Sequence, residues 1–117
     1  MRAAPALLIE HTSRRASGVL DLTHLVRQTL GDTALEREIL QLFLRQSTSL
    51  LQGIENPQSP ERQRLAAHTL KGSARAVGAW RVAEAAESVE VRPDAGALGA
   101  LRRSIEDVNA AIVEVLA

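Results

Sequence analysis

Hydrophobic residues recur at three- and four-residue steps along nearly the whole chain, and no alternating stretch is long enough to predict a strand. The clearest pattern lies near the C-terminus, where apolar positions are spaced 3-4-3-4-3: Leu98, Leu101, Ile105, Val108, Ile112 and Val115. A seam of this kind is typical of a helix packed at a shallow angle in a bundle. The pattern therefore predicts an all-α protein.

Turn and capping residues divide the pattern into four long helices preceded by two short ones. The short helices are expected from Pro5 towards Arg15 and from Asp21 to Gly31. The long helices are expected at residues 33–55, 60–77, 79–91 and 94–116. Because the loops between the long helices are short, neighbouring helices should be antiparallel. We predict an up-down four-helix bundle with the two short helices covering one end.

The predicted helix ends depend on a few local signals. Pro60 suits the first position of its helix, and Gly78 is a typical C-terminal stop. Glu36 stands three residues after Thr33, which is the spacing of a capping box. The expected N-caps are Asp21, Thr33, Ser59 and Asp94.

Length and composition restrict the class of protein. The 117 residues suit one domain, with cap helices in 1–31 and the bundle in 32–117. Hydrophobic residues make up 45% of the chain but aromatic residues only 2%, so the core should be aliphatic. The chain has no cysteine, which excludes disulfides and thiolate chemistry. The apolar run Ala6–Ile9 is too short for a signal peptide or a membrane span, so we expect a cytoplasmic protein. The predicted bundle needs no second chain to cover its seams, so a monomer is expected.

The sequence from Leu65 to Gly78 is the least generic part of the chain. At about 100° per residue, it places His68, Lys71, Gly72 and Arg75 on the solvent side of the helix 60–77. The residues expected to face inward are Leu65, Ala66, Thr69, Leu70, Ser73 and Val77.

Two neighbours of His68 are unusual for this chain. Glycine in a helix interior costs about 1 kcal/mol relative to alanine, so Gly72 suggests that another molecule approaches the backbone there. Lys71 is the only lysine, although the chain contains 14 basic residues. A compact ammonium suits a single phosphate charge, whereas arginine suits bidentate contacts. A polar surface with no reactive residue remains the alternative explanation.

The motif His68-Thr69-Leu70-Lys71-Gly72-Ser73-Ala74, followed by Gly78, resembles the signature of histidine-containing phosphotransfer (HPt) domains. Arg75 departs from the family pattern, in which a small residue is common, and the loop before the helix is short. Further segments are similar to the family at Asp21–Leu25, Gly31–Asp32, Leu40–Phe43 and Val89–Glu90.

The resemblance implies a phosphorelay intermediate. His68 would accept a phosphoryl group on Nε2 from a receiver-domain aspartate and pass it to the aspartate of a response regulator. Glu90 matches a family position that contacts the ring, although it could also be an ordinary solvated glutamate. Lys71 would offset the phosphoryl charge.

The same resemblance implies a docking surface for receiver domains. Gly72 would let the receiver loops reach the ring, and Arg64 and Arg75 would face its acidic pocket. The chain lacks a nucleotide-binding loop, so neither ATP binding nor autokinase activity is expected. No cofactor is expected on this chain, and Mg²⁺ should come from the receiver. The protein would be a phosphocarrier rather than a free-standing enzyme.

Three other functional classes are weighed against this one. The phosphoacceptor bundle of a histidine kinase normally has an acidic residue after its histidine and a proline soon afterwards, whereas Thr69 follows His68 here. A helix-turn-helix DNA reader is disfavoured by the net charge of zero. A non-catalytic helical interaction module remains open, and only a test for phosphotransfer separates it from the relay.

Overall fold

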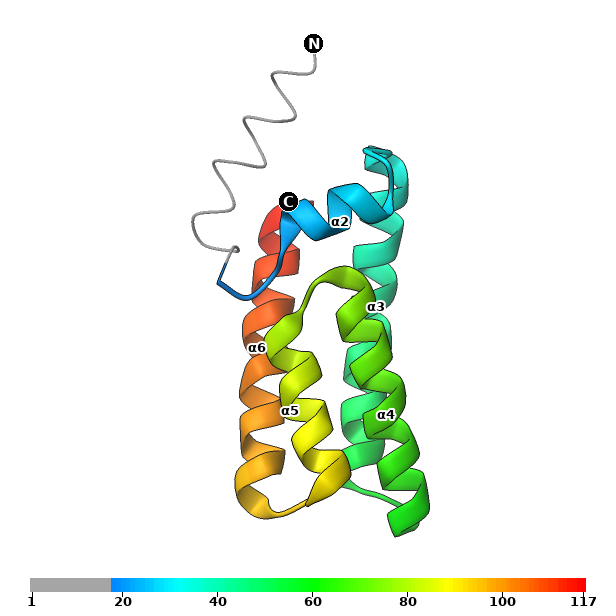
Figure 1. The fold of residues 1–117 in the computed structure, drawn as a ribbon, viewed down its shortest axis with the longest axis vertical. Helices are drawn as coiled ribbons and strands as arrows, with labels where there is room; N and C mark the ends of the chain where they lie inside the picture. Colours follow the sequence, from blue (N-terminus) through cyan, green and yellow to red (C-terminus); the bar gives the residue numbers. More distant parts are fainter. Residues whose placement is uncertain (1–17) are drawn as a thin grey trace.

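A computed structural model describes residues 18–117, which form helices and contain no strand (Figure 1). The helices are α2 (Leu22–Gln28), α3 (Thr33–Glu55), α4 (Pro60–Val77), α5 (Trp80–Val91) and α6 (Ala95–Leu116). The predicted all-α class is confirmed over these residues. The predicted boundaries of α3 and α4 are met, and α5 and α6 each begin one residue later than predicted. The helix predicted from Pro5 to Arg15 lies outside the described residues.

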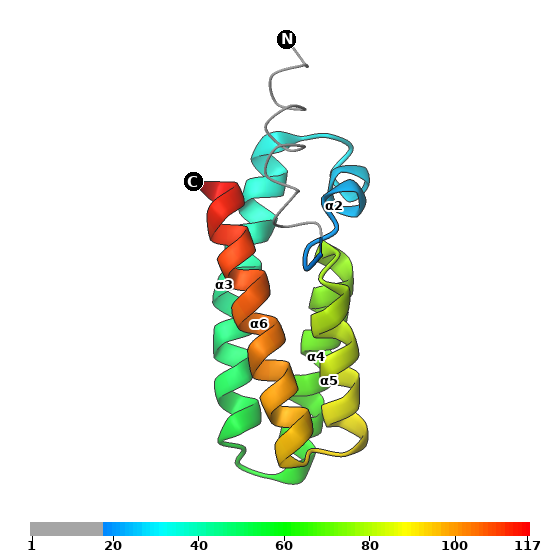
Figure 2. The same cartoon turned by 90° about the vertical axis from the view of Figure 1, so that its left-hand side faces the viewer.

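The four long helices run side by side and alternate in direction (Figure 1). Helix α4 packs against α3 and α5, and α6 packs against α5 and α3. Helix α2 lies across one end of these helices in both views, at the end where α4 turns into α5 (Figure 2). Because α4 packs mainly against α3 and α5, its opposite side faces solvent.

Most predicted helix caps are present. The side chains of Asp21, Ser59 and Asp94 each accept a hydrogen bond from a backbone amide three residues on. Gly78 has a φ of 83°, the left-handed conformation that ends α4.

The capping box predicted at Thr33 is wrong, because Asp32 is the N-cap of α3 and accepts from the amide of Leu35 at 3.0 Å. Glu36 therefore does not turn back to a cap and instead accepts a hydrogen bond from the hydroxyl of Thr29 at 3.0 Å. Asp32 and Thr33 are adjacent candidates, and the carboxylate of Asp32 interacts more strongly with the positive end of the helix.

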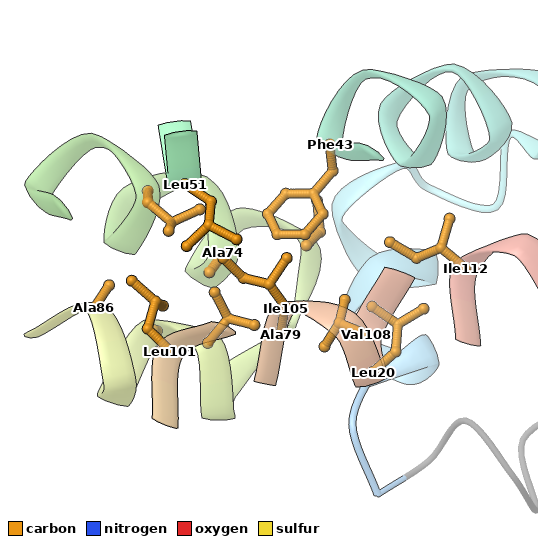
Figure 3. Close-up of a cluster of buried hydrophobic side chains, with 14 of the residues drawn as sticks. Leu20, Phe43, Leu51, Ala74, Ala79, Ala86, Leu101, Ile105, Val108 and Ile112 are labelled. Atoms are coloured by element: carbon orange, nitrogen blue, oxygen red, sulfur yellow. The ribbon is translucent and has the colours of Figure 1, made fainter. Parts of the chain in front are cut away.

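The core is aliphatic except for Phe43, as the composition predicts. Side chains from the four long helices converge in it, and Leu20 contributes from the segment before α2 (Figure 3). Ser47 is a fully buried polar residue of α3, and its hydroxyl lies 3.2 Å from Nδ2 of Asn109 on α6. This contact gives the buried hydroxyl a partner and fixes α3 relative to α6.

The predicted inward face of α4 is partly wrong. Leu65 has 65% of its surface exposed, and Thr69 is exposed as well. The buried positions of α4 are Ala67, Leu70, Ala74 and Val77. Buried alanines also occur on α5, so α4 and α5 meet through small side chains that let two helices pack closely. The buried face of α4 is therefore rotated from the predicted one towards Ala67 and Ala74.

Candidate functional site

His68 projects from the solvent side of α4, in the orientation that the helical spacing predicts. Its side chain is 64% exposed, whereas Leu70 two residues later is fully buried. The regular helix from Pro60 to Val77 fixes this orientation, because the buried residues on the opposite side hold α4 against its neighbours. The imidazole is therefore accessible to another molecule while its backbone is held in the bundle.

Glu90 on α5 connects His68 to Lys71. One carboxylate oxygen, Oε2, lies 2.8 Å from Nδ1 of His68, and the other, Oε1, lies 2.7 Å from Nζ of Lys71. The side chains of Glu90 and Lys71 are only 18% and 16% exposed. The ring, the carboxylate and the ammonium thus form one connected group across two antiparallel helices.

This arrangement determines which ring nitrogen faces solvent. The contact with Lys71 is the largest cause that holds the pKa of Glu90 below its ordinary value, and the hydrogen bond with His68 acts in the same direction. Partial burial of Glu90 opposes both effects. An ionised carboxylate can only accept hydrogen bonds, so the neutral imidazole donates through Nδ1–H. Nε2 then keeps its lone pair and points away from Glu90.

The surface beside His68 is open and partly apolar. A Cβ built on Gly72 would meet no other atom within 4 Å, so packing inside the protein does not require glycine there. A hollow of about 270 Å³ lies next to the ring and is lined by Glu61, Arg64, Leu65, His68 and Glu90. The exposure of Leu65 is missed by the sequence analysis, which assigned this residue to the core.

The two arginines assigned to docking lie on either side of the ring along α4. Arg64 lines the hollow, and Nη2 of Arg75 lies 3.4 Å from Oε1 of Glu87 on α5. Glu87 is not among the residues predicted for the site, although its position three residues before Glu90 places both carboxylates on one side of α5. Glu87 therefore offsets part of the positive charge expected from Arg75.

Among residues 18–117, no group of three or more His, Asp or Glu side chains is placed to hold a metal ion. None of the described helices is long and apolar enough to cross a membrane.

Comparison with known proteins identifies the family. The family model described as Hpt domain matches residues 38–111, which is more than half of the chain and includes His68, Lys71, Gly72 and Glu90. No curated protein and no solved structure gives a significant match in these comparisons. The chain therefore belongs to the Hpt domain family, the histidine phosphotransfer domains of two-component phosphorelays.

Proposed function

We propose that His68 is the phosphoacceptor of a phosphorelay intermediate, which takes a phosphoryl group from one receiver domain and gives it to another. The observation that supports this most strongly is the 2.8 Å contact between Nδ1 and Glu90 on a ring that is 64% exposed. A nucleophilic imidazole needs one nitrogen protonated and held, and the other free and accessible. The contact of Nδ1 with Glu90 and the exposure of the ring both support this role for His68.

Transfer to His68 forms one bond and breaks one. The lone pair of Nε2 forms the nitrogen–phosphorus bond, the bond from phosphorus to the receiver's aspartyl oxygen breaks, and its electrons leave with the aspartate carboxylate. Positive charge develops on the ring as Nε2 gives up its pair. The carboxylate of Glu90 lies against Nδ1–H, where it stabilises that charge.

Transfer away from His68 uses the same contact. The nitrogen–phosphorus bond breaks towards the ring, and the leaving group is neutral imidazole only if Nδ1 has kept its proton. A ring without that proton would have to leave as an anion, which is much less favourable. Glu90 holds the proton on Nδ1 and so supports transfer in both directions.

The other site residues are assigned to charge and docking. Lys71 offsets the phosphoryl charge, and Gly72 leaves room for the receiver loops beside the ring. Arg64 and Arg75 face the acidic pocket of the receiver, which supplies the Mg²⁺. The chain then needs no cofactor of its own and acts as a monomeric carrier.

The test is incubation of the protein with a phosphorylated receiver. We expect label on the protein that is lost in acid and stable in base, and no label on a His68→Gln variant. His24→Gln is the matched control, because His24 lies on α2 at the end of the bundle, and this variant should be labelled like the wild type. Label that persists on His68→Gln would contradict the assignment, and no label on the wild type would favour a non-catalytic interaction module.

A further inference from the structure

The positive charge of Lys71 is already paired with a carboxylate before any phosphoryl group arrives. Its ammonium lies 2.7 Å from Glu90, and both side chains are more than four-fifths buried. The neighbouring pair of Arg75 and Glu87 is longer, at 3.4 Å, and more than half of each side chain is exposed. Of these two pairs between α4 and α5, the one at His68 is therefore the closer and less solvated.

We propose that Glu90 restrains Lys71, so that a phosphoryl group on His68 must compete with Glu90 for the ammonium. This inference rests on the proposed function of His68. The competition is physically balanced: a phosphoryl group offers more negative charge, whereas Glu90 is less exposed and already in contact.

The restraint changes what Lys71 contributes. If the ammonium turns to the phosphoryl group, it gains one ionic contact and loses another, so the net stabilisation of phosphohistidine is small. A free lysine would stabilise phosphohistidine more and would hold the phosphoryl group back. The restraint thus favours a carrier that passes its phosphoryl group on.

The prediction is that Lys71 matters more once Glu90 is neutral. The quantity to measure is the equilibrium constant for transfer from a phosphorylated receiver, determined for four proteins: wild type, Lys71→Met, Glu90→Gln and the double variant. Glutamine keeps an oxygen that can accept from Nδ1–H but cannot form the ion pair. The comparison of Lys71→Met in the two backgrounds cancels any effect that Glu90→Gln has on the ring alone.

We expect Lys71→Met to lower the equilibrium constant by about twofold or less in the wild type, and by about fivefold or more in Glu90→Gln. Glu87→Gln is the matched background, since it removes the same charge from the same helix. In that background, Lys71→Met should lower the equilibrium constant by the same factor as in the wild type.

Two results would overturn the restraint. An equal factor in the wild-type and Glu90→Gln backgrounds would mean that Glu90 does not compete for Lys71. A larger factor in the wild type would mean that Glu90 positions Lys71 for the phosphoryl group. If the wild type takes no phosphoryl group at all, the proposed function fails first, and this inference falls with it.

Discussion

Gly72 is an exposed residue within the sequence of α4, and a Cβ built on it would meet no atom within 4 Å. Alanine at this position should therefore raise the free energy of unfolding, by up to about 1 kcal/mol. If the open space serves the receiver, the same methyl group should slow phosphotransfer by about tenfold or more. Urea unfolding and a transfer time course measure the two effects separately.

Gly53 provides the control for this substitution. It lies in α3, is also exposed, and has no atom within 4 Å of a built Cβ. Gly53→Ala should change stability in the same direction and leave the transfer rate unaltered. A Gly72→Ala variant that transfers as fast as the wild type would show that the receiver does not use this space.

At the scale of single residues, helical spacing predicts the exposed sides of His68, Gly72 and Arg75 correctly. It fails for Thr69, which is exposed rather than inward, and for Lys71, whose side chain is mostly buried. From the sequence, Lys71 and Glu90 are expected to have separate roles, one at the phosphoryl group and one at the ring. That one carboxylate reaches both Nδ1 and Nζ depends on the side-chain conformations and spacing of two helices, which periodicity does not determine.

At the scale of helices, single local signals predict the start of α4 and the cap of α6, whereas α2 ends at Gln28, before the predicted stop at Gly31. Ser59 with Pro60 begins α4, and Asp94 caps α6, as expected. The prediction fails where two signals compete, as at Asp32 and Thr33. The prediction of the buried face of α4 fails for another reason. Leucine is more hydrophobic than alanine, but close packing between α4 and α5 favours the smaller side chain.

The orientation of α4 can be tested with two leucines of the same helix. Leu65→Ala should cost less than about 1 kcal/mol of unfolding free energy because the side chain is mostly exposed. Leu70→Ala should cost about 2–5 kcal/mol because Leu70 is fully buried. Urea unfolding compares them directly. Equal costs would contradict the orientation of α4 and, with it, the exposure of His68.

At the scale of the whole molecule, contacts of Asp21 and Trp80 attach the segment before α2 to the bundle. The amide of Asp21 donates to the carbonyl of Gly78 at 2.9 Å, and Nε1 of Trp80 donates to the Asp21 carboxylate at 3.0 Å. A Cβ on Gly78 would lie 2.8 Å from the Asp21 carbonyl oxygen, so glycine is required there for this close approach as well as for its φ. The sequence predicts the glycine as a helix stop but not this contact.

This attachment has a pH dependence. The hydrogen bond from Trp80 is the largest cause that holds the pKa of Asp21 below its ordinary value of 3.8. A carboxyl group with a lowered pKa stabilises the folded state fully above its unfolded value, and the contribution is lost as the pH falls through the folded value. Trp80→Phe removes the donor, so its stability deficit should be larger at pH 6 than at about pH 3.

Urea unfolding of the wild type and Trp80→Phe at the two pH values measures this difference. In an Asp21→Asn background, Trp80→Phe should lower the free energy of unfolding by nearly the same amount at both pH values. A deficit in Trp80→Phe that stays constant with pH would show that the indole stabilises the fold through packing alone.

The role proposed for Glu90 is to hold Nδ1 of His68 and leave Nε2 to carry phosphorus. Nuclear magnetic resonance of the ¹⁵N-labelled protein, phosphorylated by a receiver, tests it by correlating ³¹P with the ring nitrogens. We expect one phosphorylated residue, His68, with the phosphorus bonded to Nε2. A bond to Nδ1, or phosphorus on any other residue, would contradict it.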